Sequence, residues 1–394
     1  MLSIAHVRHA LEARREDLVG FDVTVAQERT RYDEILTWME GQDSRSLMGW
    51  LAMIPRSGAL PTDERVAGQP VIHRFEHHWK NHEDARTWAR EVLLGVPTLG
   101  VDGSQIAPSH DFSIPVGAVQ VGWFENRHTP AQDYVKDIRF EVLPPTELAR
   151  DQDGTRTFPD LQVSLRRFEL ECQTLVDYMR RRAGHRPRPV CFFDGSLIIS
   201  FAAQMRPELQ RAYLNAVLTL LDTSEETRVP LVGFVDTSAA TDLVSMLRYL
   251  CGEADQPRIS DSVLLRSRMR WGDRSEAFIC ARDDRMFERA NEELNYYQRV
   301  AFLYVKTTSD NPPVRLDLPV WLLEDGLLED VVNVVRAECV VGTGYPYAIE
   351  TADAVAVITA ADRERFYRIF QDFLAENDVP VRYSRKAFSK RGRR

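Results

Sequence analysis

The order of strand-like and helical segments between residues 96 and 235 most constrains the fold. Apolar residues first recur with the period of a strand in three successive runs, and helical spacing then alternates with further short apolar runs. The predicted segments are strands at 98–106, 114–124 and 138–143, a helix at 160–182, a strand at 189–197, a helix at about 207–222 and a strand at 229–235. This order predicts an α/β fold with a mixed sheet flanked by helices.

The rest of the chain supplies an arm and a tail. Residues 3–40 have the composition of one or two amphipathic helices, which suits a projecting arm that packs on a partner or on its own domain. Residues 55–70 are rich in Pro and Gly and indicate a linker. We therefore expect three parts, which are a helical arm and linker (1–94), a core (95–361), and a C-terminal helix with a basic tail (362–394).

Composition excludes several classes of protein. The chain has 394 residues and no apolar run of about 18 residues, so no membrane span is expected. Its five cysteines are scattered without a Cys-x-x-Cys pair, which fits a reduced cytoplasm and argues against zinc ribbons. No Walker pattern is present, so ATP chemistry would belong to a partner. The formal net charge of −9 is uneven, because residues 382–394 are strongly basic.

One tripeptide, Asp-Gly-Ser, occurs twice, each time directly after a short apolar run. The copies are Val-Asp-Gly-Ser at 101–104 and Phe-Asp-Gly-Ser at 193–196. A buried strand that ends in a carboxylate and then turns on Gly presents the carboxylate at the sheet edge. Asp102 and Asp194 are therefore candidate metal ligands. The alternative is that each Asp only caps a turn or faces solvent.

The helix between the two aspartates contains a third candidate ligand. Glu169 and Glu171 are two residues apart, hence about 200° apart around the helix, so one at most can face the sheet edge. We favour Glu169 and keep Glu171 as the alternative. Clustered carboxylates repel one another unless cations are present, and Mg²⁺ or Mn²⁺ prefers oxygen ligands. Two such ions could stabilise the attacking and leaving oxygens of phosphodiester cleavage.

These residues and three later segments resemble the NurA family of prokaryotic nucleases. The similarity runs from about Trp88 to the C-terminus, in the family's order. It includes Asp-Gly-Ser-Gln-Ile at 102–106, the helix with Arg and Glu, and the second Phe-Asp-Gly-Ser. The later segments are Ile-Ser-Asp at 259–261, Gly-Asp-Arg-Ser-Glu-Ala-Phe at 272–278 and Gly-Tyr-Pro-Tyr-Ala at 344–348.

The resemblance implies a ribonuclease-H-like core, a homodimer, and dependence on Mn²⁺ or Mg²⁺. It also implies 5′-to-3′ exonuclease and single-strand endonuclease activity on DNA, in end resection for recombinational repair with the hexameric HerA helicase. Asp102 and Asp194 match the family's metal-binding aspartates, and Glu169 is expected to match its helix glutamate. Tyr345 matches a family tyrosine that would position water or the scissile phosphate.

The chain departs from the family at Asp353, where a His is usual. A carboxylate can still bind metal, but it adds a negative charge. We expect Asp353 to assist the metal ligands. The main alternative is a catalytically weakened subunit that binds DNA or docks to a helicase, and an RNase acting on structured RNA is a third possibility.

Five basic residues are candidate contacts to the DNA backbone. They are Arg274, Lys306, Arg385, Lys386 and Lys390. For Arg274 the alternative is a surface turn with a structural ion pair, and for the tail residues it is a role in solubility alone.

Overall fold

The computed structural model describes residues 2–54, 56–77, 79–109, 112–131, 133–148, 159–253, 256–282 and 296–380. The chain forms two compact units, and each is built from two stretches of sequence. Unit 1 comprises Met1–His78 and Val235–Val320, and unit 2 comprises Trp79–Phe234 and Trp321–Arg394. These units differ from the three expected parts, because residues 235–320, which were expected in the nuclease core, pack with the N-terminal stretch.

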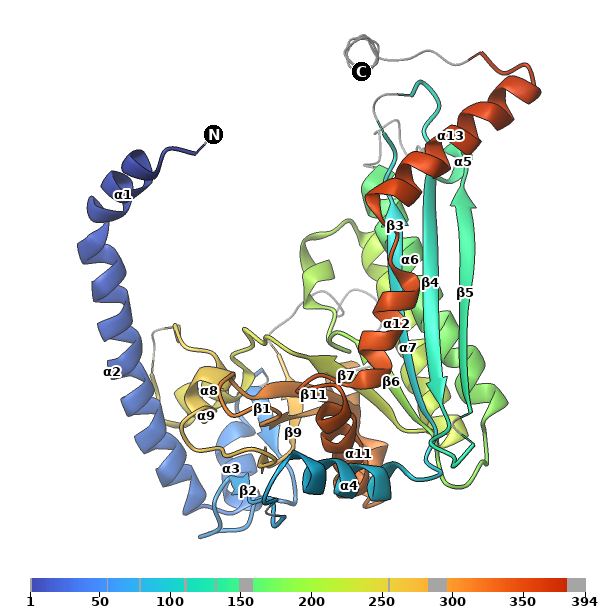
Figure 1. The fold of residues 1–394 in the computed structure, drawn as a ribbon. Coiled ribbons are helices and arrows are strands. Elements are labelled where there is room, and N and C mark those ends of the chain that lie inside the picture. Colours follow the sequence, from blue (N-terminus) through green and yellow to red (C-terminus); the bar gives the residue numbers. More distant parts are fainter. Residues whose placement is uncertain are drawn as a thin grey trace. The chain divides into compact units, whose positions relative to one another are not determined.

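Unit 2 contains a mixed five-stranded sheet (Figure 1). Strands β3, β4 and β5 form an antiparallel meander, and β6 lies parallel to both β3 and β7. The order is β7 (Leu231–Val235), β6 (Val190–Asp194), β3 (Thr98–Ile106), β4 (Gly117–Asn126) and β5 (Tyr134–Leu143). This arrangement confirms the predicted ribonuclease-H-like mixed sheet flanked by helices.

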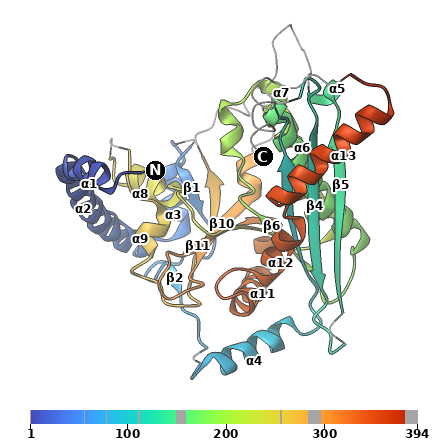
Figure 2. The same ribbon diagram turned by 45° about the horizontal axis from the view of Figure 1, so that its top comes forward.

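Helices cover both faces of this sheet. On one face, α6 (Pro159–Arg181) contacts β3 and β4 and also packs against α7 (Pro207–Thr227). On the other face, α12 (Tyr347–Ala356) lies across β3 and β4 (Figures 1 and 2). The remaining helices of unit 2 are α4 (His82–Leu93), α5 (Pro145–Leu148), η1 (Ser200–Gln204), α10 (Trp321–Glu324), α11 (Leu328–Val341) and α13 (Ala360–Glu376).

Two glycines allow α12 to approach the sheet closely. A Cβ on Gly100 would lie 2.2 Å from the carbonyl oxygen of Ala348, and one on Gly122 would lie 2.7 Å from the amide nitrogen of Ala356. Any side chain at either position would push the helix off the sheet. The sheet's core strands are otherwise buried, and β6 is buried from Val190 to Phe193 before it ends at the exposed Asp194.

Unit 1 contains a second set of strands and the N-terminal helices. Antiparallel pairing joins β1 to β9, β9 to β10 and β10 to β11, while β8 pairs with both β2 and β10. The strands are β1 (Gly58–Pro61), β2 (Ile72–His73), β8 (Arg274–Ser275), β9 (Phe278–Ala281), β10 (Val300–Val305) and β11 (Val314–Pro319). The helices are α1 (Ile4–Glu12), α2 (Arg15–Glu40), α3 (Ser44–Leu51), α8 (Asp242–Leu250), α9 (Asp261–Leu265) and η2 (Tyr296–Arg299). The predicted linker at 55–70 thus contains β1, which is part of this sheet.

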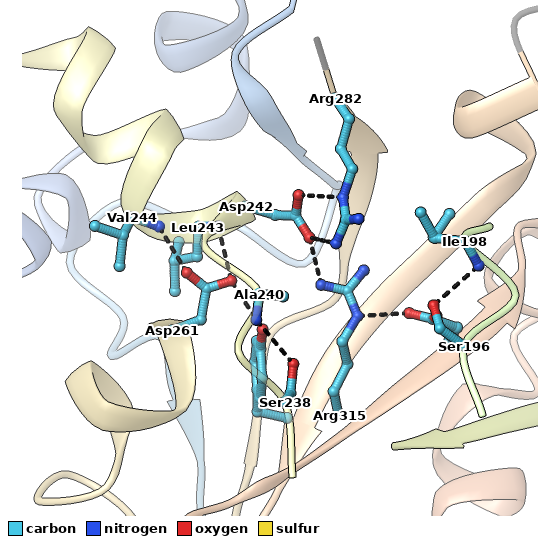
Figure 3. Close-up of polar contacts among 12 residues, drawn as sticks. Ser196, Ile198, Ser238, Ala240, Asp242, Leu243, Val244, Asp261, Arg282 and Arg315 are labelled. Atoms are coloured by element: carbon cyan, nitrogen blue, oxygen red, sulfur yellow. Dashed lines mark hydrogen bonds and ion pairs between the residues drawn. The ribbon is translucent and has the colours of Figure 1, made fainter. Parts of the chain in front are cut away.

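A buried ionic network fixes α8 in unit 1 (Figure 3). The Asp242 carboxylate accepts hydrogen bonds from Arg282 Nε at 2.7 Å and Nη2 at 2.8 Å, and also from Arg315. Asp261 accepts from the amides of Leu243 at 3.0 Å and Val244 at 2.9 Å at the start of α8. Such a network is paired internally, so breaking one pair would leave an uncompensated buried charge.

None of the described helices is long and apolar enough to cross a bilayer.

Candidate metal centre

Asp102 and Asp194 occupy neighbouring positions on two parallel strands. Val101 of β3 is paired in register with Phe193 of β6, so the residue that follows each is an aspartate at the same level. Adjacent strands are about 4.8 Å apart, and residues in register point to the same face of a sheet. The two carboxylates predicted from the repeated Asp-Gly-Ser tripeptide are therefore brought together.

The pKa of Asp102 reflects the nearby carboxylates. The pKa of its carboxyl group is raised to about 6, chiefly by burial; the carboxylates of Asp194 and Asp353 act in the same direction, and a hydrogen bond from the Gly103 amide opposes them. A cation at this position would offset the repulsion among these carboxylates.

Glu171, and not the favoured Glu169, is the helix glutamate that reaches the two aspartates. Glu171 is 8% exposed, and both Asp102 and Asp194 act on its ionisation. Glu169 instead accepts a hydrogen bond from Arg166 Nη1 at 3.1 Å, and Arg166 also pairs with Glu141. The structure therefore corrects the preference for Glu169.

Gly103, the glycine of the first Asp-Gly-Ser, makes room for Glu171 beside β3. A Cβ at this position would lie 2.3 Å from Glu171 Oε1 and 2.8 Å from Arg167 Cγ. Gly103 faces α6, whereas Asp102 lies on the face covered by α12, since Gly122, its partner on β4, contacts Ala356. Glu171 thus approaches from the α6 side through the space that the missing side chain leaves.

The buried carboxylate of Glu171 is not fully hydrogen-bonded. Its Oε1 atom is buried without a hydrogen-bond partner, and the nearest guanidinium nitrogen, Arg167 Nε, is 3.7 Å away. The pKa of this carboxyl group is raised to about 8, chiefly by burial; the charge of Arg167 opposes the increase, and the carboxylates of Asp102 and Asp194 contribute to it. A buried orphan oxygen among carboxylates fits a divalent cation, because hard cations prefer oxygen donors.

Tyr345 also lies at this site, at the start of the turn before α12. Its hydroxyl donates a hydrogen bond to Asp194 Oδ1 at 2.6 Å, and its ring packs edge-on against Phe234 of β7. The phenol therefore fixes one oxygen of the Asp194 carboxylate. Asp353, on α12, is exposed beside Asp102.

The carboxylates are not positioned to coordinate one ion together. Throughout the part of the chain that the structure describes, no three Asp, Glu, His or Cys side chains are arranged to hold an ion as they stand. The four acids lie on four elements: Asp102 on β3, Asp194 on β6, Glu171 on α6 and Asp353 on α12. A bound cation would have to draw Glu171 and the two strand aspartates closer.

Two predicted DNA contacts are instead structural. Arg274 is 5% exposed and donates to both carboxylate oxygens of Glu64, at 3.0 and 2.7 Å, so it matches the alternative of a structural ion pair. Lys306 is buried, its Nζ donates to the carbonyl oxygen of Asn311, and burial lowers its pKa. Both side chains form these hydrogen bonds within unit 1. The tail residues Arg385, Lys386 and Lys390 lie outside the described residues.

One further residue of the site was not expected from the sequence. Arg167 Nη1 donates to the carbonyl oxygen of Gly103 at 3.0 Å, which holds α6 to β3 beside Glu171. The sequence does contain a pair of arginines, Arg166 and Arg167, just before Glu169. Spacing alone does not tell which arginine faces the sheet.

Comparisons with known proteins found a matching family model and similar solved structures. A family model described as the NurA domain matches residues 96–358, which is more than half of the chain and includes all the acids of the site. No curated protein matches. The solved structures that are similar include a crystal structure of NurA with manganese, with 10% identity, a TM-score of 0.42, and coverage of 76% of this chain and 94% of that chain. The catalytic domain of human endonuclease V has 13% identity, a TM-score of 0.34, and coverage of 74% and 89%.

Proposed function

The chain belongs to the NurA family of nucleases, and from this premise we propose that it is a metal-dependent nuclease that hydrolyses phosphodiester bonds in DNA. The single observation that carries the proposal is the convergence of Asp102, Asp194 and Glu171 from three elements, with an unpartnered buried oxygen on Glu171. Holding carboxylates close together, with Glu171 buried, costs stability, so their presence points to a function that needs them.

We propose roles for the residues from their positions. Asp102, Asp194 and Glu171 would hold Mn²⁺ or Mg²⁺, with Asp353 assisting from α12. Bound divalent ions supply Lewis acidity, which activates water and stabilises charge on the phosphate. Tyr345 keeps Asp194 in one orientation, and Arg167 keeps α6 against β3. Gly103 keeps the space between them open for the Glu171 carboxylate.

The finer parts of the proposal rest on the family resemblance. These are 5′-to-3′ exonuclease and single-strand endonuclease activity, a role in DNA end resection, two bound ions, a homodimer and a HerA-type helicase partner. Divalent-ion use is in line with solved NurA structures that contain manganese, one of them with dAMP bound as well.

The experiment compares substitutions of two glutamates on α6, Glu171 and Glu169. Labelled single-stranded DNA is incubated with Mn²⁺ and the wild-type chain, Glu171→Gln or Glu169→Gln. Glu171→Gln removes a metal ligand and is expected to reduce cleavage by about 100-fold or more, whereas Glu169→Gln is expected to stay within a few-fold of wild type. Asp102→Asn and Asp194→Asn should abolish cleavage. Manganese affinity, measured by electron paramagnetic resonance, should fall in the same variants.

Two outcomes count against the proposal. Cleavage that survives in both Asp102→Asn and Asp194→Asn would place the active site elsewhere. Binding of DNA without cleavage by the clean wild-type chain would favour the catalytically weakened docking subunit, for which the replacement of the family His by Asp353 is the specific observation. The same assay with structured RNA tests the third possibility.

A further inference from the structure

Glu338, in the last turn of α11, is a buried carboxylate that the proposed chemistry does not use. It is 1% exposed, and the residues that bond to it belong to unit 2, as it does itself. Its Oε1 accepts a hydrogen bond from the Thr98 hydroxyl at 2.8 Å, and its Oε2 accepts one from the Ala348 amide at 2.9 Å. Burying a carboxylate is costly unless such hydrogen bonds compensate. The contacts of Glu338 therefore indicate what it does.

The first turn of α12 is capped by this carboxylate from another helix. Pro346, the residue before α12, gives the first turn no side-chain hydrogen bond. Ala348 is the second residue of α12, and the first amides of a helix have no acceptor within the helix itself. Glu338 takes the place of the missing cap, and its negative charge lies at the positive end of the helix dipole.

The other oxygen of Glu338 ties this cap to the strands beneath α12. Thr98, which donates to it, is the first residue of β3 and is fully buried. His128, which follows β4, places its Nε2 3.4 Å from the same oxygen, and its Nδ1 donates to the carbonyl oxygen of Val96 at 2.7 Å. Glu338 thus joins the start of α12 to the start of β3 and the end of β4, the strands on which the helix lies (Figures 1 and 2).

The backbone of His128 is held in an uncommon conformation. Its φ is +48°, in the left-handed region that residues other than glycine rarely adopt. Its amide donates to Asn126 Oδ1 at 3.0 Å, and its carbonyl oxygen accepts from the Gly95 amide at 3.0 Å. These two hydrogen bonds and the one from Nδ1 fix the imidazole ring beside Glu338.

The chain that Glu338 closes leads to the candidate metal centre. The turn between residues 338 and 348 carries Tyr345, whose hydroxyl donates to Asp194. The turn is tightly folded, since a Cβ on Gly342 would lie 2.1 Å from the carbonyl oxygen of Tyr345. The helix that follows carries Asp353. A shift at the start of α12 would therefore move both Tyr345 and Asp353.

We propose that Glu338 is a positioning residue of the nuclease: it holds α12 and the turn before it against β3, so that Tyr345 and Asp353 stay beside the strand aspartates. This role rests on the proposed function of the metal centre, although Glu338 itself touches neither metal nor substrate. Without its two acceptor oxygens, the Thr98 hydroxyl and the Ala348 amide would be left as buried donors, which favours a displaced helix. Displacing groups that orient metal ligands typically costs about 10- to 100-fold in metal affinity or activity.

The experiment compares Glu338→Met with Glu338→Gln. Met fills a similar volume but its sulfur is only a weak acceptor, whereas the Gln oxygen still accepts from the Ala348 amide and the Gln amide group can donate to Thr98 or His128. With single-stranded DNA, Glu338→Met is expected to lower kcat and manganese affinity by about tenfold or more, while KM for DNA stays within about threefold. Glu338→Gln is expected to stay within about threefold of wild type in all three quantities. Manganese affinity is measured by electron paramagnetic resonance.

Val217→Ala is the control for a loss of stability alone. Val217 is fully buried on α7, which packs against α6, and the smaller side chain leaves a cavity. Thermal unfolding of each variant sets the temperature below which all of them are folded, and the assays are run there. Val217→Ala should unfold at a lower temperature than wild type and keep the wild-type kcat and manganese affinity.

Hydrogen–deuterium exchange in EDTA follows the start of α12 without metal or DNA. Exchange in residues 345–352 should be faster in Glu338→Met and unchanged in Glu338→Gln and Val217→Ala. Wild-type exchange in Glu338→Met, or a wild-type kcat and manganese affinity in that variant, would overturn the proposal. So would a Glu338→Gln variant as impaired as Glu338→Met, because the acceptor would then not be the cause. If the wild-type chain cleaves no DNA, the nuclease proposal fails, while exchange and manganese affinity still decide whether Glu338 positions α12.

Discussion

A hydrogen bond from a tyrosine orients the carboxylate of Asp194. The donor is the Tyr345 hydroxyl, at 2.6 Å from Oδ1. Tyr345→Phe removes this donor but keeps the ring that packs on Phe234. Groups that orient metal ligands typically contribute about 10- to 100-fold in metal affinity or activity. We therefore expect manganese affinity and the cleavage rate to fall by about tenfold, measured by paramagnetic resonance and by gel assay.

Two results would contradict this role for Tyr345. If Tyr345→Phe binds manganese like wild type, the hydroxyl does not position a ligand. If the variant unfolds at a much lower temperature than wild type, the loss of activity would reflect stability instead.

Glu171 should make the stability of the metal-free chain depend on pH. Burial raises the pKa of its carboxyl group from 4.5 to about 8, so the folded state holds the proton more tightly than the unfolded state. The free energy of unfolding is then highest below pH 4.5 and decreases as the pH rises through 8, by up to a few kcal/mol. Urea unfolding in EDTA across this range measures the decrease.

Glu171→Gln should flatten this pH dependence, whereas Glu169→Gln should keep it, because the Glu169 carboxylate is paired with Arg166. Added Mn²⁺ should restore stability to wild type at high pH but not to Glu171→Gln. An unchanged pH dependence in Glu171→Gln would show that another group is responsible.

At the scale of elements, the contact between α6 and β3 depends on Gly103. Gly103→Ala would place a methyl group 2.3 Å from Glu171 Oε1 and 2.8 Å from Arg167 Cγ. Overpacking of this kind costs about 1–3 kcal/mol. We expect both a lower free energy of unfolding and a weaker affinity for manganese, because the side chains of Glu171 and Arg167 must move away from the strand.

Gly20 in α2 provides the control for this prediction. A Cβ there meets nothing within 4 Å, so Gly20→Ala should be neutral or stabilise by about 1 kcal/mol through helix propensity. Chemical unfolding of both variants measures the change in the free energy of unfolding. Equal stabilities of Gly103→Ala and wild type would mean that the approach of α6 to β3 is not tight.

The sequence predicted the elements of unit 2 well because their apolar patterns are strong. Strand β3 has the predicted bounds 98–106, and α6 begins and ends within one residue of its prediction. The glutamate of α6 was predicted wrongly for a physical reason. Leu170 and Cys172 are both buried, since the sheet covers one side of α6 and α7 covers another. The apolar pattern therefore does not single out the side that faces the sheet.

The short strands of unit 1 could not be predicted in this way. Strands β2 and β8 have two residues each, and β1 contains Gly58 and Pro61, so none shows a clear alternation. Their stability comes from pairing over long distances along the chain, as when β1 pairs with β9. Local sequence carries no signal of such a partner.

At the scale of the whole molecule, the N-terminal stretch is part of a core and is not a detachable linker. Residue Gly58 pairs with Ala281 and Pro61 pairs with Phe278, so β1 completes the sheet of unit 1. Leu36, Met39 and Leu47 are fully buried in the same unit. A fragment that keeps only residues 95–361, the core expected from the sequence, would leave the apolar surface that these residues cover exposed to water.

We therefore expect the 95–361 fragment to aggregate or to lack fixed tertiary structure. Each fully buried large apolar side chain contributes about 1.5–3 kcal/mol, and the loss of several exceeds the 5–15 kcal/mol by which a domain is typically stable. Deleting residues 2–12 alone should leave the thermal midpoint unchanged, since no residue of α1 is buried. Near-ultraviolet circular dichroism and limited proteolysis of the two truncated proteins distinguish these outcomes. A soluble, cooperatively unfolding 95–361 fragment would show that the strands from 235–320 can fold without β1, α2 and α3.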